Sequence, residues 1–217
     1  MAQFTRIEIA TLMSTTGLVP LFYHHDIEVS KKVLKACYNG GARLLEFTSR
    51  GDFAFEVFAE LNKYAIAELP GMALGVGSVT DAAAASLYMQ LGANFIVTPV
   101  LREDIAIVCN RRKVLWSAGC ATLTEIAKAE ELGCDVVKLF PAGAMGLEYF
   151  KALKAPLDHI EYFAVGGINP NNVGDWFKAG ASGIGYGCVV NDAKTGKIDF
   201  EASKKLSEDF VNQAKSN

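Results

Sequence analysis

The chain has 217 residues, of which 51% are hydrophobic and 21% charged, enough to bury one core but few for two independent domains. We therefore predict a single domain over residues 1–217. The formal charge of −3 leaves no basic excess, and no run of Lys and Arg is interleaved with aromatic residues. These features argue against a nucleic-acid partner.

The N-terminal segment lacks the basic head, unbroken apolar core and small-residue cleavage site of a secretory signal. No later apolar run approaches membrane-spanning length, so we expect a cytoplasmic protein with no membrane contact. The five cysteines are scattered without a Cys-x-x-Cys pair, and the three histidines show no metal-ligand spacing. The sequence predicts reduced thiols, no metal site and no cofactor.

Eight short runs rich in β-branched and aromatic residues alternate with longer amphipathic stretches, which is the pattern of repeated βα units around a parallel sheet. The expected strands cover residues 18–23, 43–48, 73–78, 95–99, 114–119, 136–141, 162–167 and 183–187. The expected helices lie near residues 27–39, 53–68, 81–91, 102–111, 123–132, 145–154 and 171–179. A polar loop around 191–197 then leads to a C-terminal helix near 200–215.

The residues between these runs support the same architecture. Asp26, Asp52 and Thr80 are candidate N-caps, and Thr122 with Glu125 has the spacing of a capping box. The glycines expected to end helices are Gly41, Gly92, Gly133 and Gly180. With no long linker, this βα period favours a closed (β/α)8 TIM barrel of the α/β class over an open doubly wound sheet.

In either architecture the site lies at the C-terminal ends of the strands, and Lys138 lies there within the apolar run VVKLFP. An ammonium in such a run is rarely tolerated unless it is paired or neutral. Desolvation favours the uncharged amine, which is the form that attacks a carbonyl to give a Schiff base. The alternative is a lysine that extends to solvent or pairs with a carboxylate for structural reasons.

Glu46 lies in another apolar strand, and alternation along that strand places Glu46, Thr48 and Arg50 on one face. Burial raises the pKa of a carboxyl toward the range useful for proton transfer. The planar guanidinium of Arg50 suits the two oxygens of a substrate carboxylate. A structural pair of Glu46 with Arg50 is the alternative, but a lysine at the same barrel mouth favours catalysis.

Glycine-rich segments follow the seventh expected strand, at Gly166 and Gly167, and make up the eighth, from Gly183 to Gly187. Barrels commonly hold a phosphate between these two loops and a helix N-terminus. Glycine lets backbone N–H groups approach an anion, although glycine-rich strand ends are also ordinary turns. Both interpretations stay open from the residues alone.

Taken together, six segments resemble the 2-keto-3-deoxy-6-phosphogluconate / 4-hydroxy-2-oxoglutarate (KDPG/KHG) aldolases, a class I family. The resemblance extends from about Leu18 to Val190. Its Glu-x-Thr-x-Arg and Lys-x-Phe-Pro-Ala motifs, in this order, are far more specific than the glycine segments. The six segments are LVPLF (18–22), GGARLLEFTSRG (40–51), GVGSV (75–79), VTPVL (97–101), VVKLFPA (136–142) and VGGINPNN (165–172).

The resemblance implies a homotrimeric, metal-independent aldolase that needs no cofactor and binds a small 2-keto acid through an imine on Lys138. It makes Glu46 the acid/base that relays protons through water. Arg50 and Ser78 would bind the carboxylate end of the keto acid. The full set of substrate-binding residues that it implies is Arg50, Thr48, Ser78, Pro99, Phe140, Gly166, Gly167 and Gly187, with Pro99 and Phe140 as pocket walls and the Gly166-Gly167 pair at the distal phosphate.

The chain departs from the family pattern mainly where the phosphate is expected. Gly185-Tyr186-Gly187 stands where relatives often read Gly-Gly-Ser, so a hydroxyl is missing and Tyr186 is expected to intrude. Asn169, Ala118 and Val100 replace a frequent serine, proline and glycine. None of these changes removes the lysine, glutamate or arginine, so they bear on the aldehyde half of the substrate more than on the reaction.

The leading hypothesis is cleavage of KDPG to pyruvate and glyceraldehyde 3-phosphate, with 4-hydroxy-2-oxoglutarate, which gives pyruvate and glyoxylate, as a second substrate. An aldolase for the galactonate-derived or another 2-keto-3-deoxy acid is the nearest alternative. A phosphate-binding barrel isomerase or epimerase would not need Lys138 as an imine former. A non-catalytic sugar-phosphate binder is disfavoured, because a buried lysine and glutamate destabilise the fold and are unnecessary for simple binding.

Overall fold

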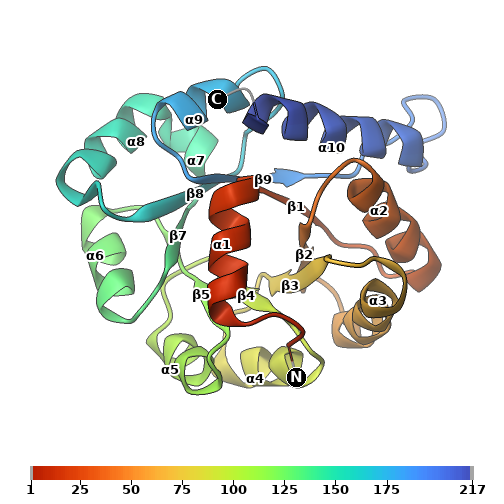
Figure 1. Cartoon of the computed structure of the whole chain (residues 1–217), viewed down its shortest axis with the longest axis horizontal. Coiled ribbons are helices and arrows are strands. Elements are labelled where there is room, and N and C mark those ends of the chain that lie inside the picture. The colour runs from red at the N-terminus through yellow and green to blue at the C-terminus, as the bar shows by residue number, and fades with distance from the viewer. Residues whose placement is uncertain (1, 216–217) are drawn as a thin grey trace.

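The computed structural model describes residues 2–215, in which strands and helices alternate and curve into a barrel (Figure 1). All strand pairings are parallel, in the order β5-β4-β3-β2-β1-β9-β8-β7-β6. The strands are β1 (Leu18–Phe22), β2 (Leu44–Thr48), β3 (Ala73–Gly77), β4 (Phe95–Val97), β5 (Leu115–Ser117), β6 (Gly119–Cys120), β7 (Val136–Leu139), β8 (Glu161–Val165) and β9 (Gly183–Gly187).

The fifth expected strand is divided at Ala118 into β5 and β6. β5 pairs with β4 and β6 pairs with β7, so this one segment of chain joins the two ends of the sheet. Backbone hydrogen bonds continue on both sides of it: the Thr98 N–H donates to the Ser117 carbonyl, and the Lys138 N–H donates to the Ala118 carbonyl. The nine strands thus occupy eight positions of a nearly closed barrel, which confirms the predicted (β/α)8 TIM-barrel class.

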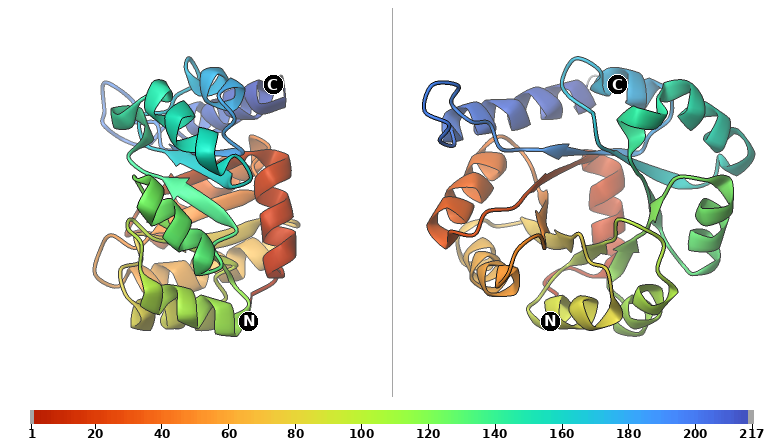
Figure 2. Two further views of the ribbon diagram at one scale, coloured as in Figure 1. Left: turned by 90° about the vertical axis from the view of Figure 1, so that its left-hand side faces the viewer. Right: turned by 180° about the vertical axis from the view of Figure 1, so that it is seen from behind.

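Helices follow the strands and cover the outside of the barrel (Figures 1 and 2). Their bounds are α1 (Arg6–Thr16), α2 (Ile27–Asn39), α3 (Ala54–Glu68), α4 (Ala82–Gln90), α5 (Glu103–Arg112), α6 (Leu123–Glu131), α7 (Ala142–Met145), α8 (Leu147–Lys154), α9 (Val173–Lys178) and α10 (Phe200–Lys215), with a 3-10 turn at Ala155–Leu157. The expected helix at 145–154 is preceded by the short α7, from which Gly146 separates it at a φ of 83°. α10 is the expected C-terminal helix.

α1 is not among the expected helices, and it closes one end of the barrel. In the left panel of Figure 2 it lies across the end from which the strand arrows point away. Ile9 and Met13, one turn apart, are buried against the side chains that fill the barrel interior, including Leu44 and Phe95. The N-terminal end of the barrel is therefore covered, and the C-terminal end is the one available to a ligand.

The observed helix N-caps agree only in part with those predicted from the sequence. Asp26 caps α2 through a 2.9 Å hydrogen bond from the Val29 N–H, and Thr122 with Glu125 forms the expected capping box. The predictions for Asp52 and Thr80 are wrong by one residue. Phe53 is the N-cap of α3 in a left-handed conformation, and Asp81 caps α4 by accepting from the Ala84 N–H.

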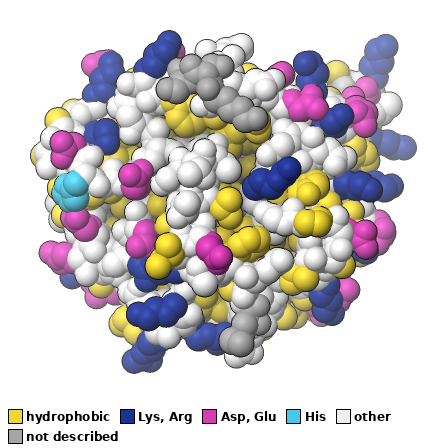
Figure 3. Space-filling view, viewed as in Figure 1, with side chains coloured by type: hydrophobic (Ala, Val, Ile, Leu, Met, Phe, Trp, Pro, Cys, Tyr) yellow, Lys and Arg dark blue, Asp and Glu magenta, His cyan; other side chains and the backbone are white. Residues whose placement is uncertain are grey.

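The surface carries charges of both signs. Figure 3, which views the face carrying α1, shows Lys and Arg side chains interspersed with Asp and Glu around the rim. No helix within residues 2–215 is both long enough and apolar enough to cross a bilayer.

The core has two layers, one inside the barrel and one between the strands and the surrounding helices.

Candidate active site

A cavity of about 180 Å³ opens at the C-terminal ends of the strands. It is lined by residues of β1, β2, β7, β8 and β9 and by the segments that follow β2, β3, β4, β7 and β8. Of the predicted site residues it contains Glu46, Arg50, Ser78, Pro99, Lys138, Phe140, Gly166, Gly167 and Gly187. These residues are separated by up to 141 positions in the sequence, and it is the closed parallel sheet that gathers them at one mouth.

Lys138 lies in β7 between Gly119 of β6 and Phe163 of β8, and only 6% of its surface is exposed. Its Nζ is 5.0 Å from the centroid of the Phe140 ring, within the range of a cation–π contact. No ion pair within residues 2–215 includes Lys138. The alternative of a structural ion pair therefore has no support, and the amine is available for chemistry.

Glu46 is 1% exposed, and its Oε2 accepts no hydrogen bond within the described residues. Burial raises the pKa of Glu46, while the positive charges of Lys138 and Arg50 act in the opposite direction. No salt bridge joins Glu46 to Arg50 in residues 2–215, which leaves the structural pair considered from the sequence without support. A buried carboxyl with a raised pKa, near a lysine, is suited to moving protons.

Gly77 of β3 makes the position of Glu46 sterically accessible. A Cβ at Gly77 would overlap Oε1 and Cδ of the Glu46 side chain. Gly119 likewise leaves room for the backbone of Pro99, because a Cβ at Gly119 would overlap the Pro99 carbonyl. Neither glycine was singled out from the sequence, although a glycine inside a strand is a signal of close approach by a neighbour.

Arg50 and Ser78 lie together at the rim, where the Arg50 Nε donates a 3.4 Å hydrogen bond to the Ser78 Oγ. Ser78 has a φ of 59°, in the left-handed region that is uncommon for residues other than glycine. Such strain concentrates at functional sites, and here it turns the hydroxyl toward a cationic side chain. The pair presents a guanidinium and a hydroxyl, both suited to a carboxylate.

The loop after β8 has the backbone of an anion site. Gly166 and Gly167 have φ values of 96° and 76°, and their carbonyls are already occupied. The Gly143 N–H donates to the Gly166 carbonyl at 2.8 Å, and the Asn172 Nδ2 donates to the Gly167 carbonyl at 3.1 Å. Within residues 2–215 the N–H groups of Gly167 and Ile168 donate no hydrogen bond, so they are available to an anion.

Thr48, Gly187 and Tyr186 differ in where they lie relative to the cavity. Thr48 is outside the 180 Å³ cavity and donates a 3.3 Å hydrogen bond to the Phe22 carbonyl, so its contact with substrate stays a prediction. Gly187 is exposed at the cavity edge, with open space where a side chain would lie. Tyr186 belongs to the cavity lining, but its ring does not intrude as expected: it is buried and stacks on Phe210 of α10, with the ring centroids 3.8 Å apart.

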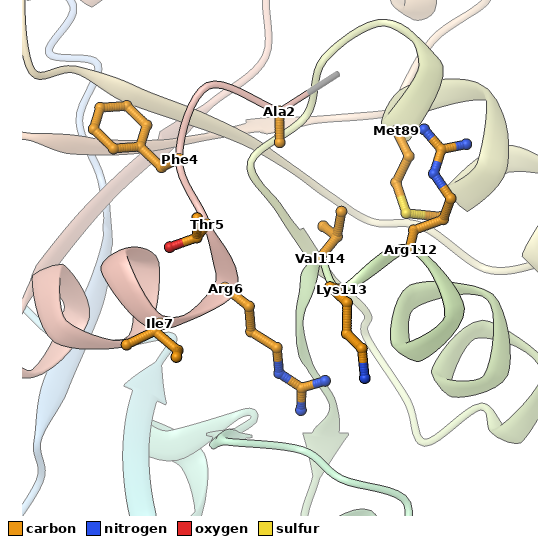
Figure 4. Close-up of a pocket in the computed structure, with 9 residues that line it drawn as sticks. All are labelled: Ala2, Phe4, Thr5, Arg6, Ile7, Met89, Arg112, Lys113 and Val114. Atoms are coloured by element: carbon orange, nitrogen blue, oxygen red, sulfur yellow. The ribbon is translucent and has the colours of Figure 1, made fainter.

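A larger cavity, of about 590 Å³, lies at the opposite end of the barrel beside the start of α1 (Figure 4). Its lining includes Arg6, Arg112 and Lys113 but no carboxylate or imidazole among the described residues. Arg6 is engaged by a 2.5 Å ion pair to Asp135. The smaller cavity at the barrel mouth combines a lysine with a carboxyl, which the larger cavity does not, so the smaller one is the candidate active site.

Comparison with known proteins agrees with this geometry. A family model described as KDPG and KHG aldolase matches residues 9–206. The chain belongs to this family. It is therefore an aldolase, an enzyme of the carbon–carbon lyase class, as the sequence motifs predicted.

Two relatives from Escherichia coli (strain K12) differ in similarity and coverage. The aldolase shares 39% identity with 2-dehydro-3-deoxy-6-phosphogalactonate aldolase, over 52% of this chain and 56% of that protein, so the match spans about half of each. It shares 26% identity with KHG/KDPG aldolase over 94% of this chain and 95% of that one. The exact substrate is not decided at these identities.

Solved structures of the family have the same fold as the aldolase described here. A structure titled native KDPGal matches with a TM-score of 0.83 and 26% identity, covering 93% of this chain and 96% of the other. A KDPG aldolase of Zymomonas mobilis ZM4 with 3-phosphoglycerate matches with a TM-score of 0.83 and 24% identity, covering 94% and 95%. At 24% identity, the similarity to the Zymomonas mobilis structure shows a shared fold and nothing more.

Proposed function

We propose that this aldolase cleaves 2-keto-3-deoxy-6-phosphogluconate to pyruvate and glyceraldehyde 3-phosphate through a Schiff base on Lys138. The observation that carries the proposal is a buried lysine with no ion-pair partner in the described chain, in the same cavity as a buried carboxyl. A lysine amine that is buried at a cavity and engaged in no salt bridge within the described chain is free to attack a carbonyl carbon. Burying a lysine and a carboxyl destabilises the fold, and a catalytic role accounts for their presence.

The chemistry follows from these groups. The Lys138 amine attacks the C2 carbonyl of the keto acid, and loss of water leaves an imine. The protonated imine nitrogen withdraws electrons, so the C3–C4 bond breaks with its electron pair held as an enamine. The Glu46 carboxylate accepts the proton of the C4 hydroxyl through water, and the aldehyde leaves. Protonation of the enamine at C3 and hydrolysis then release pyruvate and the free lysine.

The remaining residues bind the two ends of the substrate. Arg50 and Ser78 bind the C1 carboxylate, and Pro99 and Phe140 form the walls beside the reacting carbons. The free N–H groups at Gly167 and Ile168 support binding of the distal phosphate in this proposal. Gly187 provides space but no hydroxyl, so the loop after β8 carries the phosphate contacts. 4-Hydroxy-2-oxoglutarate, which lacks a phosphate, is a second substrate in the same proposal.

Trapping the imine tests the proposal. The protein is incubated with pyruvate, reduced with borohydride and analysed by intact and peptide mass. We expect a pyruvate adduct on the peptide that contains Lys138, and none in Lys138→Arg. Lys151→Arg, at an exposed position of α8, is the matched control and keeps the adduct. A folded wild-type protein without an adduct would overturn the Schiff-base mechanism.

The galactonate-derived epimer is a second candidate substrate, because the 39% identical relative bears the name of a phosphogalactonate aldolase. The two substrates differ in configuration at C4, the carbon whose hydroxyl loses its proton. Comparing kcat/KM for the two 6-phosphates separates the candidates, and a ratio above about 10 in either direction corresponds to about 1.4 kcal/mol of transition-state discrimination.

Two other classes are tested by the same variants. An isomerase or epimerase on this barrel would retain turnover in Lys138→Arg, and a non-catalytic binder would bind a keto acid with neither imine nor product.

We further propose that the enzyme is a homotrimer in the cytoplasm and that residues 1–217 form one domain. These three statements rest on the composition and the family resemblance.

A further inference from the structure

An open groove of about 460 Å³ adjoins the active-site cavity and has no role in the reaction described above. It runs between the ends of β1 and β2 and the segment that follows β9. Leu21, Arg50 and Gly187 line both the groove and the cavity. The two spaces are therefore neighbours across a shared wall, and a substrate held in one can extend into the other.

Gly187 forms the junction between them. It pairs with Leu21 across the β1–β9 ladder, and a Cβ at Gly187 would meet no atom within 4 Å. A larger residue at this position would fill the space between the cavity and the groove. The absence of a side chain leaves a passage at the distal end of the bound substrate.

The outer wall of the groove is a preformed hairpin. Asn191 and Ile198 form an antiparallel bridge, and the Asp192 Oδ1 accepts from the backbone N–H groups of Lys194 and Thr195 at 3.0 and 2.7 Å. The Gly196 N–H donates to the Asp192 carbonyl at 2.8 Å. In Figure 2 this loop projects from the side of the barrel opposite α1, beside the candidate active site.

The groove carries hydrogen-bond donors and no carboxylate among its described lining residues. The Asp26 N–H donates to the His24 Nδ1 at 3.0 Å, so Nε2 is the ring nitrogen left to donate to a ligand. Asn191, which also lines the groove, has a side-chain amide that can donate as well. Donors without carboxylates suit the oxygens of hydroxyl and phosphate groups.

We propose that this groove binds the far end of an acceptor aldehyde longer than three carbons, with His24 and Asn191 as specificity-determining residues. The inference rests on the proposed aldolase function. In the synthetic direction the C3 carbon of the pyruvate enamine attacks the aldehyde carbon and forms the C–C bond. The aldehyde oxygen takes up a proton, water hydrolyses the imine, and the polar tail of the acceptor passes Gly187 into the groove.

Condensation of pyruvate with two aldehydes tests this inference. Glyceraldehyde 3-phosphate fits the cavity alone and reports on the proposed function, whereas erythrose 4-phosphate adds one hydroxylated carbon. The full-length enzyme is compared with His24→Ala and Asn191→Ala. The matched control is His25→Ala, a histidine beside the groove but outside its lining.

We expect His24→Ala and Asn191→Ala to raise KM for erythrose 4-phosphate about five- to tenfold at similar kcat, the effect of losing one hydrogen bond. KM for glyceraldehyde 3-phosphate should change less than about twofold, a shift within the range of surface substitutions. Equal increases in KM for both aldehydes would overturn the inference. So would a wild-type enzyme that condenses glyceraldehyde 3-phosphate but not erythrose 4-phosphate. If neither aldehyde condenses, the proposed function fails and the inference fails with it.

Discussion

The Glu46 carboxyl is buried without a hydrogen-bond partner at Oε2 in the described chain, so its ionised form is poorly solvated in the folded protein. Burial raises the pKa of Glu46 above its ordinary value of 4.5, although Lys138 and Arg50 oppose the rise. The folded state therefore binds this proton more tightly than the unfolded state. The resulting stability is fully present below about pH 4.5 and is lost as the pH rises through the raised pKa.

We predict that Glu46→Gln stabilises the protein at pH 8 by about 1–3 kcal/mol, the usual range for a buried polar group that is left unsatisfied. The advantage should vanish below about pH 4.5, where the wild-type carboxyl is protonated in both states. Urea denaturation across this pH range measures it. Parallel stability curves for the two proteins would contradict the raised pKa.

Gly77 is predicted to be required for catalysis although it has no functional group. Gly77→Ala would displace Glu46, and we expect kcat to fall roughly 10²-fold, the lower end of the range for general acid–base catalysis. Gly75→Ala, on the same strand, is the matched control, because its Cβ would meet the Phe95 ring and leave Glu46 in place. Overpacking costs each variant about 1–3 kcal/mol. Equal kcat losses would show that both effects are structural.

At the scale of elements, α1 shows how one helix face maintains the barrel. Ile9 is fully buried against the barrel interior, whereas Ile7 on the same helix is 78% exposed. We predict that Ile9→Ala lowers the free energy of unfolding by about 2–5 kcal/mol. Ile7→Ala should change it by less than about 0.5 kcal/mol. Urea denaturation measures both, and similar losses would contradict the packing of α1 on the barrel.

The sequence predicted the strand positions well because runs of β-branched residues bounded by glycine and polar residues are local signals. It did not predict α1, since Ile7 and Ile9 point to opposite sides and only Ile9 and Met13 are buried. The division of the fifth strand at Ala118 also escaped prediction, because it depends on pairing with two different neighbours, β4 and β7. Pairing is a property of the sheet rather than of the segment.

The two catalytic candidates, Lys138 and Glu46, were predictable because each is an ionisable residue within an otherwise apolar strand. Gly77 was missed because its contact with the Glu46 side chain depends on the β2–β3 register, which the sequence does not specify. The orientation of Tyr186 was predictable, since period-two alternation places it opposite Gly185 and Gly187, on the outer face of β9.

On the scale of the whole molecule, apolar side chains remain exposed along one flank. Phe53, Val100 and Leu123 are 66%, 53% and 42% exposed. Phe53 and Leu123 lie at the starts of α3 and α6, and Val100 lies in the segment between β4 and α5. In Figure 1, α5 and α6 are neighbours around the barrel, and α4 lies between α3 and α5. Exposed apolar residues on neighbouring elements are candidates for a contact between copies of the chain.

We predict that light scattering after size exclusion gives a mass about three times the 23.3 kDa of one chain. The double variant Phe53→Asp, Val100→Asp should give a single-chain mass, because two unpaired charges would be buried at the contact. Ile7→Asp, on α1 at the covered end of the barrel, is the matched control and should leave the mass unchanged. A single-chain mass for the wild type would contradict the trimer. A trimeric double variant would instead move the contact away from the flank of α3, α5 and α6.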